Sequence, residues 1–86
     1  MNLMTDIEKL RKKIDKLDQK IVNNLTKRFE LIEKIGKIKK KLKIKITDKK
    51  REKEIIQKLL RTSKKYPNEM VDIYIKIIKI SKKLQR

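Results

Sequence analysis

The chain has 86 residues, and its 28 lysines and arginines against 11 aspartates and glutamates give a formal net charge of +17 at pH 7. It contains no cysteine and no histidine, which excludes disulfides, thiolate or imidazole metal sites, and catalysis by either residue type. We expect residues 1–86 to form one small domain. Its size is near the limit below which a single chain buries too little apolar surface to be stable alone. We therefore expect a second copy of the chain to contribute to the fold.

The charge and hydropathy of the chain also indicate which classes of partner it can bind. No apolar run approaches the roughly 18 residues that a membrane helix needs, and residues 1–6 do not resemble a signal peptide, so we expect a cytoplasmic protein with no membrane partner. The basic surface attracts phosphates, but lysines occupy the polar face of every expected helix and only 3% of residues are aromatic, which leaves few rings to stack on bases. A basic helical dimer that binds nucleic acid remains an alternative that we do not favour.

Residues 6–42 are predicted to form one long helix, because apolar side chains recur every three or four residues. Such a helix extends about 54 Å, further than the diameter of an 86-residue globule, so its apolar stripe needs a partner. Thr5 or Asp6 is the expected cap, and Gly36 costs about 1 kcal/mol relative to alanine. The stripe consists of Ile7, Leu10, Ile14, Leu17, Ile21, Leu31, Ile35, Ile38 and Leu42.

Asn24 and Arg28 interrupt this apolar stripe. A buried arginine is costly unless an anion pairs with it, whereas Asn24 could simply set the register of a coiled coil. Lys39 lies within about 20° of the face that carries Arg28. Arg11 lies roughly 26 Å from Arg28 along the axis and reaches that pocket only from an antiparallel second chain. The spacing predicts a pocket made by both chains, although Arg11 and Lys39, taken singly, could be solvated.

Two shorter helices are predicted, over residues 48–62 and 69–85. Thr47 or Asp48 would cap the first of them, and Asn68, which follows Pro67, would cap the second. Residues 43–46 connect the long helix to the first short one. The predicted fold class is therefore all-α, with one very long and two short helices that form an intertwined homodimeric helical bundle.

Polar residues gather at the ends of the short helices. Asp48 and Glu52 lie one turn apart with Arg51 between them, and Ser81 and Gln85 lie one turn apart near the end of the chain. Each has a structural explanation: a cap, a surface ion pair, or a fraying helix end. Together with the cations of the long helix, they indicate a small dianion that also bears a hydroxyl and a neutral acceptor oxygen. The chemistry would then depend on positioning and charge stabilisation, without a metal.

Six motifs, in order over nearly the whole chain, resemble the all-helical (AroQ-class) chorismate mutases of the small monofunctional dimeric type. The resemblance implies an isomerase that converts chorismate to prephenate by a one-step Claisen rearrangement, in phenylalanine and tyrosine biosynthesis, with no cofactor. The motifs are Leu10-Arg11, Ile14-x-x-Leu17-Asp18, Arg28-x-Glu30-Leu31, Ile35-Gly36-Lys37-x-Lys39, Asp48-x-x-Arg51-Glu52 and Ser81-x-x-x-Gln85.

The resemblance also implies a role for each matched residue. Arg28 and, from the partner chain, Arg11 would clamp the carboxylates of the substrate. Lys39 and Gln85 would hydrogen-bond the ether oxygen as negative charge develops there, and Lys39 would also touch a carboxylate. Glu52 would hold the ring hydroxyl.

The remaining matched residues would complete the substrate site. The backbone near Asp48 would assist in holding the hydroxyl, and Arg51 and Ser81 would make ring-side contacts. A departure from many relatives is the absence of proline from residues 43–46. An isochorismate-pyruvate lyase of the same fold is the nearest alternative, and those enzymes usually lack the acid that matches Glu52.

Overall fold

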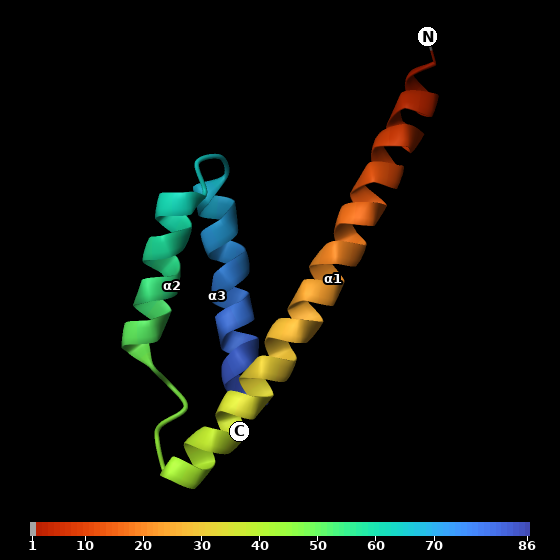
Figure 1. Cartoon of the computed structure of the whole chain (residues 1–86). Helices are drawn as coiled ribbons and strands as arrows, with labels where there is room; N and C mark the ends of the chain where they lie inside the picture. The colour runs from red at the N-terminus through yellow and green to blue at the C-terminus, as the bar shows by residue number, and fades with distance from the viewer. Residues whose placement is uncertain (1) are drawn as a thin grey trace. The chain divides into compact units, whose positions relative to one another are not determined.

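The structure is a computed structural model that describes residues 2–86. These residues form three helices and no strand, which confirms the all-α prediction: α1 spans Leu3–Leu42, α2 Lys49–Thr62 and α3 Pro67–Leu84 (Figure 1). The chain divides into two units, Met1–Glu30 and Leu31–Arg86, so α1 contributes to both. None of the helices in the described residues is both long and apolar enough to cross a membrane.

The start of α1 differs from the prediction. The Asn2 side chain accepts a hydrogen bond from the Met4 backbone N–H at 3.0 Å, and the Asn2 carbonyl accepts one from the Asp6 N–H at 3.2 Å. Asn2 is therefore the cap, and the choice of Thr5 or Asp6 was wrong. Asp6 instead lies in the first turn, where its negative charge is favourable to the helix dipole.

The apolar stripe of α1 is exposed in the single chain. Its side chains are between 39% exposed, for Ile7, and 63% exposed, for Leu42, and Gly36 is the buried residue of this helix. Contiguous apolar surface of this kind usually marks a protein–protein interface. We call the following residues the α1 stripe: Ile7, Leu10, Ile14, Leu17, Ile21, Leu31, Ile35, Ile38 and Leu42.

Within Leu31–Arg86, a short loop joins α1 to α2. Lys43 adopts a positive φ of 56°, and the Ile44 N–H donates to the Lys39 carbonyl at 2.9 Å, a hydrogen bond that satisfies an end carbonyl of the helix. Asp48 then caps α2, since its side chain accepts from the Arg51 N–H at 3.0 Å. Of the two predicted caps, Asp48 rather than Thr47 is the one used.

Helix α3 begins two residues before its predicted start. Tyr66 is the N-cap residue, in the left-handed region at φ 61° and ψ 42°, and Pro67 occupies the first turn. The prediction of Asn68 as the cap was therefore wrong. Proline suits the first helical position because its missing N–H has no partner there in any case and its fixed φ is already helical.

Helices α2 and α3 form an antiparallel hairpin (Figure 1). Its small core consists of Ile77 and Ile78, which are 8% and 9% exposed, with Ile55, Ile56 and Leu59 half-buried on α2. The antiparallel arrangement brings the start of α2 beside the end of α3. These are the two helix ends that carry the predicted polar residues.

Candidate active site

Asp48 and Arg51 lie at the first turn of α2, where their side chains make local contacts. The Asp48 carboxylate is occupied by the capping bond to the Arg51 N–H. The Arg51 guanidinium lies 3.7 Å from Glu54, and the two side chains are 66% and 51% exposed, so this ion pair contributes little to stability. Neither Asp48 nor Arg51 lines the groove between α2 and α3.

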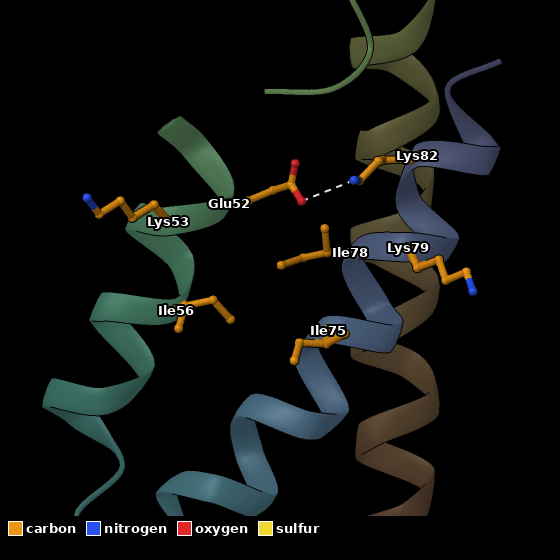
Figure 2. Close-up of a pocket in the computed structure, with 7 residues that line it drawn as sticks. All are labelled: Glu52, Lys53, Ile56, Ile75, Ile78, Lys79 and Lys82. Carbon is orange, nitrogen blue, oxygen red and sulfur yellow. Dashed lines mark ion pairs between the residues drawn. The ribbon is translucent and has the colours of Figure 1, made fainter. Parts of the chain in front are cut away.

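Glu52 points across the hairpin to α3. Its Oε1 lies 3.1 Å from Lys82 Nζ, and the Lys82 and Glu52 side chains are 34% and 30% exposed (Figure 2). Its other oxygen, Oε2, is buried and has no hydrogen-bond partner among the described residues. Glu52 therefore has one oxygen paired with Lys82 and one buried oxygen that lacks a donor within residues 2–86.

A groove of about 610 Å³ runs between the two helices beside this ion pair. Its floor is apolar, since Ile56, Ile75 and Ile78 lie between the helices, while Lys53 and Lys79 point away to either side (Figure 2). The groove therefore combines an apolar floor, suited to a ring, with Glu52 and Lys82 at one end. Its full lining is Glu52, Lys53, Ile56, Ile75, Ile78, Lys79 and Lys82.

Ser81 and Gln85 are buried at the end of α3, with exposed fractions of 4% and 6%. The Ser81 hydroxyl donates to the Ile77 carbonyl at 2.7 Å, and the Gln85 Nε2 donates to the Ser81 carbonyl at 3.3 Å. The Gln85 Oε1 is buried and has no hydrogen-bond partner in the part of the chain that the structure describes. These residues are thus ordered parts of the packing in this structure, not a frayed helix end.

The last turns of α1 meet Gln85. A Cβ built on Gly36 would lie 2.8 Å from the Gln85 Cα and 3.0 Å from its carbonyl oxygen, so only glycine allows this approach without a shift of the backbone. One turn further along α1, Lys39 Nζ donates to the Ile46 carbonyl at 2.9 Å. Lys39 is half-buried, and its ammonium has further N–H donors.

Arg11 and Arg28 lie in the other unit, Met1–Glu30. Arg11 is exposed and Arg28 is half-buried, and both belong to α1. The other predicted site residues all lie in Leu31–Arg86. Within that unit, the structure joins the start of α2 to the end of α3 through Glu52 and Lys82.

Two groups of the site were not predicted from the sequence. They are Lys82, which pairs with Glu52, and the Ile46 carbonyl, which accepts the hydrogen bond from Lys39. Lys82 is one lysine among many, and nothing local distinguishes it, because its partner lies 30 residues earlier in the chain. Its position next to Ser81 and one turn after Ile78 was the available signal. No group of three acidic, cysteine or histidine residues within residues 2–86 is arranged to hold a metal ion.

Comparison with known families identifies the family of the chain. Residues 10–86 match the family model of chorismate mutase type II. The chain belongs to the chorismate mutase type II family. The match confirms the resemblance noted in the sequence, and it covers every predicted site residue from Arg11 to Gln85.

The chain is also similar to two individual proteins, one known from its sequence and one from a solved structure. The chain is 37% identical to the bifunctional chorismate mutase/prephenate dehydratase of Aquifex aeolicus (strain VF5), over 96% of this chain and 25% of that protein. It therefore spans about a quarter of the length of that relative. A solved structure of a conserved hypothetical protein from Pyrococcus furiosus is similar with a TM-score of 0.83 and 41% identity, covering 95% of this chain and 97% of that one.

Proposed function

We propose that the protein is a chorismate mutase that converts chorismate to prephenate in the cytoplasm, for phenylalanine and tyrosine biosynthesis. The observation that carries this proposal is the family match over residues 10–86. The reaction is an intramolecular Claisen rearrangement. It needs neither a nucleophile nor a cofactor, in keeping with a chain that has no cysteine or histidine.

The first task of the site is to hold a flexible dianion in its reactive shape. Arg28 and Lys39 of one chain and Arg11 of the partner subunit bind the two carboxylates. Guanidinium groups match carboxylates in two-point geometry. Clamping both carboxylates selects the compact conformer in which the two reacting carbons lie close together, so the binding energy is used to orient the substrate.

The second task is to stabilise the transition state. Negative charge grows on the ether oxygen as its bond to the ring breaks, and Lys39 Nζ donates a hydrogen bond to it. The Gln85 amide gives one N–H to the Ser81 carbonyl, and its second N–H donates to the same ether oxygen. These donors are set before the reaction begins, so they stabilise the transition state more than the ground state.

The ring hydroxyl is held by Glu52. The Oε2 of Glu52 is buried and has no partner within residues 2–86, which supports this role. A buried acceptor without a donor is costly, and a ligand hydroxyl would satisfy it. The backbone near Asp48 assists, and Arg51 and Ser81 contribute on the ring side. The lyases of this fold usually lack the acid that matches Glu52, so this residue favours the mutase.

We further propose that the protein is a homodimer, with the α1 stripe as the interface. Burying a large aliphatic side chain contributes about 1.5–3 kcal/mol, and the residues of the stripe are 39% to 63% exposed in a single chain. A second α1 packed antiparallel on the stripe would cover these side chains. It would also deliver Arg11 of the partner subunit to the pocket, which makes the dimer necessary for both stability and catalysis.

The proposed function is tested by incubating the purified protein separately with chorismate and with isochorismate, without added metal or cofactor. We expect chorismate to be consumed and prephenate to appear in equal amount, identified by proton NMR. Isochorismate should release little pyruvate by comparison. A protein that leaves chorismate unchanged over a range of pH and temperature, or that releases pyruvate instead, would contradict the proposal.

A further inference from the structure

The ion pair between Lys82 and Glu52 links the end of α3 to the start of α2. Its two atoms are 3.1 Å apart and both side chains are about one third exposed. By contrast, the pair between Arg51 and Glu54 lies within one helix, at 3.7 Å, and is largely solvated. One turn before Lys82, Ile78 is 9% exposed, so packing fixes the helix from which the lysine extends.

The two oxygens of Glu52 are not equivalent. Lys82 holds Oε1, whereas Oε2 is buried and has no partner among the described residues. The terminal torsion of a glutamate is broad and roughly two-fold, so an unrestrained carboxylate turns readily. An ammonium on one oxygen therefore determines where the other oxygen points.

Charge gives Lys82 a second effect. A dianionic substrate and the Glu52 carboxylate repel one another at short range, and this repulsion is strong where water is partly excluded. The Lys82 ammonium beside Glu52 offsets it. The other two lysines of the groove, Lys53 and Lys79, point away from Glu52 (Figure 2), so neither replaces Lys82 in this position.

We propose that Lys82 is a positioning residue that holds the Glu52 carboxylate so that Oε2 meets the ring hydroxyl of the substrate. The proposal rests on the proposed function, because the hydroxyl is that of chorismate. Lys82 itself does not touch the substrate and acts only through Glu52. The ion pair with Lys82 uses Oε1 of Glu52 and leaves Oε2 without a donor from residues 2–86. An ammonium shared between both oxygens would instead occupy both acceptors.

The test compares Lys82→Met, Lys82→Arg and Lys83→Met in the full-length protein at constant ionic strength. Lys83 is the exposed neighbour of Lys82, so Lys83→Met matches the loss of charge without touching Glu52. We expect Lys82→Met to lower kcat/KM for chorismate about tenfold, with a rise in KM and a fall in kcat, because a misplaced contact weakens both binding and orientation. Lys82→Arg should restore most of the loss, and Lys83→Met should stay within about twofold of wild type.

A double-mutant cycle with Glu52→Gln separates positioning from a general effect of charge or folding. Because Lys82 acts through Glu52, adding Lys82→Met to Glu52→Gln should lower kcat/KM no further. Equal values for Lys82→Met and Lys83→Met, or independent losses in the double variant, would overturn the role of Lys82. An inactive wild type would instead overturn the proposed function, and the role of Lys82 with it. Circular dichroism melts confirm that each variant is folded, and Lys82→Gln serves as the second neutral variant.

Discussion

Replacing Lys39 with alanine is expected to lower kcat/KM for chorismate by about 10²–10³-fold. In the proposed mechanism the ammonium of Lys39 donates to the ether oxygen at the point where negative charge develops, and such a preorganised donor acts mainly on the transition state. We expect kcat to fall more steeply than KM rises, since the ground-state ether oxygen carries little charge. Steady-state kinetics from the loss of chorismate absorbance measures both constants.

Lys39 also donates to the Ile46 carbonyl at 2.9 Å, so the loss of charge must be separated from loss of this tether. Lys39→Gln keeps an N–H donor but removes the charge, and we expect it to be nearly as impaired as Lys39→Ala. Lys40→Ala removes a lysine that is exposed on the same helix and should behave as wild type. If Lys39→Ala retained activity within about threefold of wild type, the assigned role in charge stabilisation would be wrong.

Gly36→Ala is expected to be the most damaging change of a single methyl group. In an exposed helix interior, alanine is about 1 kcal/mol more favourable than glycine. Here the new Cβ would lie 2.8 Å from the Gln85 Cα, and backbone cannot rotate away as a side chain can. Overpacking of this kind costs about 1–3 kcal/mol. After the helix preference for alanine of about 1 kcal/mol is subtracted, we expect the free energy of unfolding to fall by up to about 2 kcal/mol.

The same substitution should displace Gln85 from the position in which we propose that it donates to the ether oxygen. A shift of about 1 Å in a positioned group can lower the rate by about 10²-fold, and we expect a loss of that order in kcat, measured where urea titration shows the variant folded. Lys37→Ala introduces the same residue at the adjacent exposed position and is the matched control. A Gly36→Ala protein as active and as stable as wild type would show that the approach of Gln85 to α1 is unimportant.

The helices could be predicted from the spacing of apolar residues, because that spacing is a local property of the chain. Their starts were harder to predict, because several polar residues near each start compete to be the cap. At α1 the Asn2 side chain reached the Met4 N–H. At α3 the fixed φ of Pro67 allowed the helix to begin before Asn68, with Tyr66 in the left-handed region.

The candidate site was only partly predictable. Glu52 and Gln85 could be singled out from matched motifs, but their immediate partners could not. The pairing of Glu52 with Lys82 and the contact of Gly36 with Gln85 both depend on how separate helices pack. In the sequence alone, nothing distinguishes Lys82 from the many other lysines, and Gly36 is only a residue of low helix propensity.

Arg11→Ala and Arg28→Ala chains that are mixed, unfolded and refolded together show whether two chains build each pocket for chorismate. Each variant alone should be nearly inactive. In a mixed dimer, one pocket has both arginines and the other has neither, so random pairing restores about one quarter of the wild-type activity.

Mixing Arg28→Ala with Lys39→Ala is the control for this experiment, because both residues come from the same chain in each pocket and no mixed dimer has an intact one. Native mass spectrometry counts the mixed dimers in both samples. We expect recovery near one quarter for the first mixture and none for the second. Proven mixed dimers of Arg11→Ala and Arg28→Ala with no recovered activity would contradict a pocket shared between two chains.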